Sequence, residues 1–114
     1  MAIEEVNIVN TLVCKATEGL VFIKHDDIIC LKADRNYTEV FLVDKEKPLR
    51  AMENISSLNL VLPQNVFFQC HRSYIINTRH ISHYRKKYKE LVMINEITVP
   101  VSRSNEKGLL QRCR

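Results

Sequence analysis

Glycine is scarce in this sequence, which has only 2 glycines, Gly19 and Gly108, among 114 residues. The phosphate loops of nucleotide-binding enzymes need closely spaced glycines, because their backbone must approach the phosphates. The scarcity therefore argues against a nucleotide-binding cradle. It also means that tight turns must use Asp and Asn, and such turns are predicted at "HDD" (25–27), "ADRN" (33–36), "DKEK" (44–47) and "NE" (95–96).

Motifs of the common enzyme classes are absent as well. The sequence has no G-x-S-x-G elbow and no H-E-x-x-H pair. Cys70 and His71 are adjacent in "CHRS", but neighbouring side chains of a strand point to opposite faces and cannot act as nucleophile and base. We therefore expect no catalytic residues, and the chain is not predicted to be an enzyme.

No apolar run approaches the roughly 18 residues that span a bilayer. The start "MAIEEVNIVN" lacks a basic region followed by an apolar stretch, so no export signal is expected. The 4 cysteines form no C-x-x-C pair and are expected to be thiols rather than disulfides. These absences predict a cytoplasmic protein.

A metal site is a weak alternative. His80 and His83 lie three positions apart, which places them on opposite faces of a strand, and His25 is distant in sequence. The ordinary interpretation is surface or turn histidines. We expect no metal and no cofactor.

Charge divides the chain unevenly. Residues 1–57 contain 7 Lys/Arg and 10 Asp/Glu, a net charge of −3, whereas residues 58–114 contain 10 and 3, a net charge of +7. A basic half points to a polyanion, with nucleic acid first and an anionic membrane second. Membrane binding is disfavoured because the basic residues lie in β-rich sequence rather than on an amphipathic helix.

Short apolar segments rich in β-branched and aromatic residues indicate a mainly β domain. Strands are predicted at "TLVCKA", "GLVFIK", "IICLKA", "YTEVFLV", "SYIIN", "HISHYR", "YKELVMI" and "ITVPV". Two short helices are expected. One covers about residues 52–60, where apolar residues recur at helical spacing before Pro63. The other begins after Ser102 or Ser104, which are suitable caps, and Gly108 weakens it.

The basic residues fall into two kinds of position. "HYRKKYKE" (83–90) interleaves cations with tyrosines at a strand-turn-strand junction, a pattern that suits phosphate binding or simply a soluble hairpin tip. Arg72 and Arg103 each adjoin an apolar strand that would fix them for hydrogen bonding to base edges. The alternative for both arginines is a structural ion pair with a carboxylate.

Four segments in order, "IICLKADRNYTEVFL", "FFQCHRSYIIN", "ISHYRKKYKELVM" and "ITVPVSRSN", resemble the LytTR DNA-binding domain of bacterial response regulators. The resemblance covers about Asp27 to the C-terminus. It implies an elongated arrangement of small antiparallel sheets whose loops enter successive major grooves of double-stranded DNA. It also implies a domain at 15–114 behind a lead-in at 1–14, the end of a linker from an absent receiver domain. The chain would then be a fragment or a single-domain regulator, and a homodimer on paired sites is expected.

The resemblance and the charge pattern together predict the site residues. Base contacts are expected from Arg72, Arg103 and the loop of Asn36, Tyr37 and Thr38, with Thr38 favoured. Phosphate contacts are expected from His71, Ser73, Arg79, Arg85, Lys86, Lys87, Lys89 and Ser102. The predicted function is sequence-specific binding of double-stranded DNA in a transcription regulator of a two-component system. The alternatives are a protein-interaction module in a signalling complex and, third, an RNA-binding domain.

Overall fold

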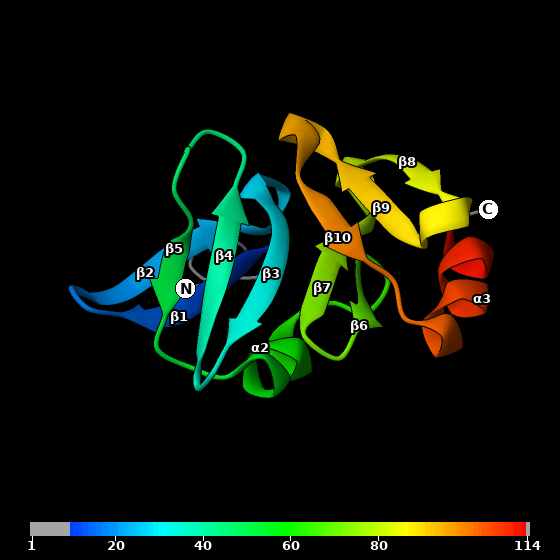
Figure 1. The fold of residues 1–114 in the computed structure, drawn as a ribbon. Helices are drawn as coiled ribbons and strands as arrows, with labels where there is room; N and C mark the ends of the chain where they lie inside the picture. Colours follow the sequence, from blue (N-terminus) through cyan, green and yellow to red (C-terminus); the bar gives the residue numbers. More distant parts are fainter. Residues whose placement is uncertain (1–9, 114) are drawn as a thin grey trace.

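The structure is a computed structural model that describes residues 10–113. Its strands form three antiparallel sheets within this range, and the molecule is elongated (Figure 1). A hairpin of β1 (Thr11–Ala16) and β2 (Gly19–Lys24) is the first sheet. The predicted mainly β fold of small antiparallel sheets is confirmed.

The other two sheets form the body of the molecule. The five-stranded sheet has the order β5 (Leu49–Ala51), β4 (Tyr37–Leu42), β3 (Ile28–Asp34), β7 (Tyr74–Asn77) and β6 (Phe67–His71). The three-stranded sheet has the order β10 (Thr98–Pro100), β9 (Glu90–Met93) and β8 (Ile81–Arg85). Single 3₁₀ turns follow β2, β7, β8 and β9: η1 (His25–Asp27), η2 (Thr78–His80), η3 (Lys86–Tyr88) and η4 (Ile94–Glu96).

The core lies on both faces of the five-stranded sheet. Ile28 and Leu31 of β3 pack with the β1–β2 hairpin and α2 (Ile55–Val61), whereas Ile29 and Cys30 pack with the three-stranded sheet and α3 (Arg103–Arg112). All four side chains are buried. A strand covered on both faces needs apolar residues at successive positions, which explains why "IICL" does not alternate.

The first predicted helix starts later than expected. Leu49–Ala51 forms β5 against β4, and Met52 N, directly after this strand, donates to Lys15 O of β1 at 2.7 Å. Asn54 then caps α2, because its side chain accepts a hydrogen bond from Ser57 N at 2.8 Å. Sheet pairing therefore outweighs the helical spacing over the first residues of the segment.

The packed unit reaches into the expected lead-in at 1–14. Leu12 and Cys14 of β1 are buried in the core and pair with β2, so this part of the chain belongs to the fold. The remainder of the expected lead-in, residues 1–9, lies outside the described residues.

Several turns without glycine contain residues with positive φ. Arg35, Lys89, Asn95 and Glu96 all have φ between 49° and 61°. The predicted "NE" turn, which joins β9 to β10, contains two of these residues. Left-handed backbone is unfavourable for most side chains, and it occurs here at the tips of three hairpins.

Candidate nucleic-acid interface

The turn between β6 and β7 carries Arg72 on a held backbone. Gln69 Nε2 donates to Arg72 O at 3.2 Å, and Ser73 N donates to His71 Nδ1 at 3.1 Å. Ala33 N of β3 donates to Ser73 O at 2.8 Å. The Arg72 side chain is exposed and forms no ion pair or hydrogen bond with residues 10–113. Among the described residues, the alternative of a structural ion pair for Arg72 is not seen.

Arg103 stands on a second held turn, at the start of α3. Ser102 N donates to Cys70 O at 3.0 Å and Val101 N to Lys89 O at 2.8 Å. Asn105 Nδ2 donates to Ser102 Oγ at 2.6 Å. The Arg103 side chain is exposed, and within the described range it has no carboxylate partner.

Folding brings these two turns together. A surface hollow of about 420 Å³ lies between them and is lined by Gln69, His71, Arg72, Ser102, Ser104 and Asn105. Its lining is polar and carries no carboxylate. Gln69, Ser104 and Asn105 were not among the predicted site residues. For Gln69 the available signal was a polar residue inside the apolar strand "FFQCH".

The turn between β3 and β4 lies next to the Arg72 turn, and Figure 1 places both on the edge that also holds the link from β10 to α3. Asn36 is exposed at this turn. Tyr37 is half-buried, and the Arg50 guanidinium lies 4.9 Å from its ring centroid.

Thr38 does not fit its predicted role as a base-reading residue. Its side chain is 0% exposed, and its hydroxyl donates to Glu53 O at 2.8 Å. The reason is strand alternation, because Thr38 faces the core on the same side of β4 as Val40. Asn36 is therefore the better candidate of this loop.

The basic segment 85–89 forms the tip of the β8–β9 hairpin at η3, as predicted. Lys86 and Lys87 are exposed and form no ion pair among the described residues, whereas Arg85 lies 3.6 Å from Glu90 and Lys89 lies 2.9 Å from Glu106. The bond from Val101 N to Lys89 O places this tip beside the Arg103 turn.

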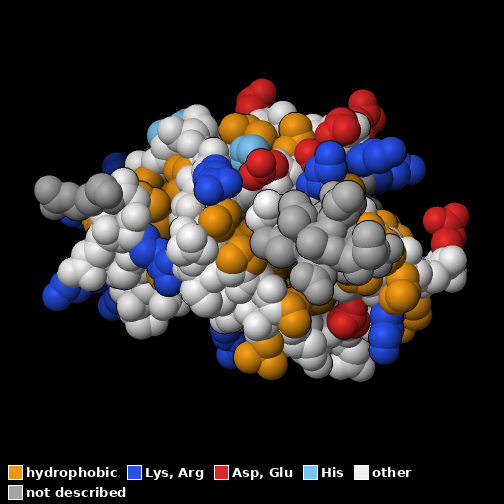
Figure 2. Space-filling model, turned by 180° about the vertical axis from the view of Figure 1, so that it is seen from behind, with side chains coloured by type: hydrophobic (Ala, Val, Ile, Leu, Met, Phe, Trp, Pro, Cys, Tyr) orange, Lys and Arg blue, Asp and Glu red, His pale blue; other side chains and the backbone are white. Residues whose placement is uncertain are grey.

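Arg79 is not brought to this group. It lies in η2, at the opposite end of β7 from Arg72, and pairs with Asp26 at 3.2 Å. Seen from behind, the end of the molecule that holds α3 shows Lys and Arg side chains without visible acidic ones, which gather toward the other end (Figure 2).

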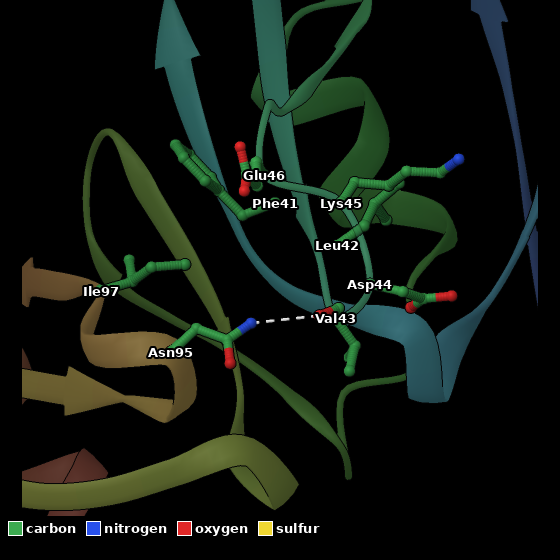
Figure 3. A pocket seen from close by; sticks show the side chains of 8 residues that line it. All are labelled: Phe41, Leu42, Val43, Asp44, Lys45, Glu46, Asn95 and Ile97. Carbon is green, nitrogen blue, oxygen red and sulfur yellow. Dashed lines mark hydrogen bonds between the residues drawn. The ribbon is translucent and has the colours of Figure 1, made fainter.

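Another hollow, of about 490 Å³, lies between the β4–β5 loop and the η4 turn (Figure 3). Asn95 Nδ2 donates to Val43 O at 3.1 Å and so bridges the two larger sheets. Asp44 and Glu46 line it, together with Lys45. Two carboxylates against one ammonium group disfavour binding of a polyanion in this hollow. The surface that carries the Arg72 turn, the Arg103 turn and the β8–β9 hairpin tip is therefore the candidate interface.

Cys70 is not placed as a nucleophile, and the described part of the chain contains no metal centre. Cys70 is 0% exposed, its thiol donates to Pro100 O at 3.6 Å, and burial raises its pKa to about 12. No three His, Cys, Asp or Glu side chains of residues 10–113 form a group that would hold a metal ion. No helix in this range is long and apolar enough to cross a membrane.

The fold and this edge define a small, mainly β module that presents cationic loops to a polyanion. The model of the LytTr DNA-binding domain family matches residues 18–114, and the chain belongs to this family. The family is not catalytic, and membership implies DNA binding in a transcription regulator.

A solved structure agrees with this assignment. The chain is similar to the LytTr DNA-binding domain of a Bacillus cereus protein described as a methyl-accepting/DNA response regulator, with a TM-score of 0.74 and 26% sequence identity. The match covers 90% of this chain and 95% of the other. A search of curated protein sequences gave no match.

Proposed function

We propose that the chain is the effector domain that reads a specific double-stranded DNA site in a bacterial transcription regulator. One observation carries the proposal: Arg72 and Arg103 are exposed and without ion pairs in the described range, and the carbonyl of Cys70 holds the second turn beside the first. An arginine on a fixed backbone can donate two hydrogen bonds to guanine O6 and N7. We assign base reading to these two arginines and to Asn36.

Phosphate binding falls to the cations and small donors around them. Lys86 and Lys87 are exposed at the hairpin tip. His71 Nδ1 accepts from Ser73 N, so the neutral ring carries its proton on Nε2 and can donate to a phosphate. Such contacts set orientation and affinity without reading sequence.

One similar structure supports a proposal about the setting of the domain. The similar Bacillus cereus protein is described as a response regulator. This supports a receiver domain as the partner in the full-length protein, and a two-component system as the source of the signal. Binding as a homodimer to paired sites is part of the same proposal.

Selection of bound duplexes from a random pool, followed by titration, tests the function. The protein is titrated with the selected duplex, a scrambled duplex of equal length and composition, and a single-stranded RNA of the selected sequence. We expect the selected duplex to bind at least about a thousandfold more tightly than the scrambled one. Equal affinity for both duplexes, or tighter binding to the RNA, would contradict the proposal.

A further inference from the structure

One carboxylate, Glu106, lies among the cations of the candidate interface. It belongs to the first turn of α3, directly after the Arg103 turn, and its side chain is only 18% exposed. Lys89 Nζ donates to Glu106 Oε1 at 2.9 Å, and the Tyr84 hydroxyl donates to Oε2 at 2.6 Å. Both carboxylate oxygens are therefore held by groups of the β8–β9 hairpin.

The contact is strong, because the carboxylate is charged at neutral pH. Hydrogen bonds from Tyr84 and then Lys89 hold the pKa of Glu106 below its usual range. Burial and the bond to Glu106 raise the pKa of Tyr84 to about 12, so its hydroxyl stays a donor. Hydrogen bonds to ionised groups are about twice as strong as neutral ones.

The backbone joins the same two elements. Lys89 adopts φ 49°, and its carbonyl accepts from Val101 N at 2.8 Å, two residues before Arg103. Arg103 is thus flanked by a main-chain bond on one side and the Glu106 contacts on the other. A carboxylate beside a cluster of cations weakens the general attraction of that cluster to phosphates. Glu106 therefore does not serve phosphate binding, and its contacts with Tyr84 and Lys89 indicate a positioning role.

We propose that Glu106 is a positioning residue of the DNA site: through Tyr84 and Lys89 it holds the Arg103 turn in register with the basic hairpin tip. We call Glu106, Tyr84 and Lys89 the clamp. In it Lys89 binds the carboxylate rather than a phosphate, unlike its neighbours Lys86 and Lys87. The inference rests on the proposed function, since it concerns the preference for one DNA sequence over another.

The test measures affinities of the whole chain for the selected and scrambled duplexes at two salt concentrations. Tyr84→Phe removes one hydroxyl and keeps the ring, while Glu106→Gln removes the charge and keeps the size. We expect both variants to lower the ratio of the two affinities by about threefold to tenfold. Glu106→Gln also releases Lys89 to the phosphates, so its salt slope steepens by about one.

Glu96→Gln is the matched control, because it removes the same charge from an exposed position in η4, and it should leave the ratio unchanged. Folded variants that keep the wild-type ratio of affinities would contradict the positioning role of Glu106. An equal rise of both affinities in Glu106→Gln would also contradict it, because the loss of one negative charge explains such a rise. If Glu106→Gln does not fold, Tyr84→Phe decides. A wild type that shows no preference between the duplexes removes the proposed function itself, whereas a wild-type preference kept by the variants removes only the clamp.

Discussion

At Arg72 and Arg103, a long exposed side chain stands on a backbone that neighbouring residues hold. The side-chain amide of Gln69 and the amide of Ala33 secure the first turn, and the carbonyls of Cys70 and Lys89 secure the second. A base contact discriminates only when the guanidinium arrives in one geometry, and long side chains lose that geometry on a mobile loop. The described contacts thus suit reading rather than simple attraction.

Replacement of these arginines distinguishes base contacts, which set sequence preference, from phosphate contacts, which set general affinity. Arg72→Ala and Arg103→Ala should each reduce the preference for the selected duplex by about 1 to 3 kcal/mol. Lys86→Ala should lower affinity for both duplexes alike and reduce the salt slope by about one. Affinity titrations measure both effects, after melting curves show that each variant is folded. Unchanged preference in folded Arg72→Ala and Arg103→Ala would show that these arginines do not read bases.

The burial of Thr38 leads to a second residue-scale prediction. Thr38→Val keeps the shape and removes the hydrogen bond to Glu53 O, so it should lower the free energy of unfolding by about 1 kcal/mol and leave the DNA preference unchanged. Asn36→Ala, at the exposed position of the same loop, should leave the free energy of unfolding unchanged and reduce the preference for the selected duplex. Urea unfolding and duplex titration measure the two outcomes. A loss of preference in stable Thr38→Val would restore the base-reading role to Thr38.

At the scale of elements, the two glycines have different reasons to be where they are. Gly108 lies inside α3, and a Cβ there would be 3.4 Å from Phe68 Cζ, an ordinary contact. Gly19 begins β2 with φ 126°, although no atom lies within 4 Å of its Cβ position. A methyl group would therefore make an ordinary contact at Gly108, where the backbone is helical, and would meet open space at Gly19, where the backbone is strained for other residues.

Alanine at the two positions should act in opposite directions. Gly108→Ala is expected to raise the free energy of unfolding by about 0.5 to 1 kcal/mol, because glycine lowers helix stability by that amount. Gly19→Ala should lower it by about 1 kcal/mol, because a side chain is strained at that φ. Chemical denaturation of both variants checks the signs. A less stable Gly108→Ala would mean that Phe68 cannot accommodate the added methyl group.

On the scale of the whole molecule, charge separation governs association. The basic half of the sequence supplies the Arg72 turn, the Arg103 turn and the hairpin tip. The fold places the Arg103 turn between the other two, because it shares a hollow with the Arg72 turn and a main-chain hydrogen bond with the hairpin tip. Neutralised phosphates release counterions, so affinity for any duplex should fall as salt rises. For about four phosphate contacts, a fourfold increase in salt should weaken binding roughly a hundredfold. Isothermal titration over a salt series measures the slope, and a flat series would contradict the electrostatic assignment.

Stability of the whole fold should depend on pH through His25. Its ring is 9% exposed and lies edge-on to Phe67, and burial lowers its pKa, with Asp26 acting weakly in the opposite direction. The unfolded chain then binds a proton more readily than the folded one, so stability is full above about pH 6.5 and falls as pH drops toward 5. Melting temperatures across this range should decline in the wild type and stay flatter in His25→Leu. The control is His83→Gln, at an exposed position of β8; the prediction fails if His25→Leu declines as steeply as the wild type.

The strands and the turns that carry Arg72 and Arg103 could be anticipated because they depend on local chemistry. Apolar, β-branched segments between Asp- and Asn-containing turns predicted β1 and β2 with their observed bounds. The "CHRS" and "VPVSRSN" segments marked the turns that carry Arg72 and Arg103. These features are properties of short stretches, so the local sequence was enough to predict them.

The surroundings of each side chain depend instead on how distant segments pack. The predicted helix began only at Ile55, because the preceding residues pair in β5 with β4 and Met52 N bonds to Lys15 O. Thr38 turned inward, Arg79 was placed at the far end of β7, and Glu106 met Lys89 and Tyr84 across 17 and 22 residues of chain. Burial and ion pairing depend on which distant segments pack together, and no local pattern contains that information.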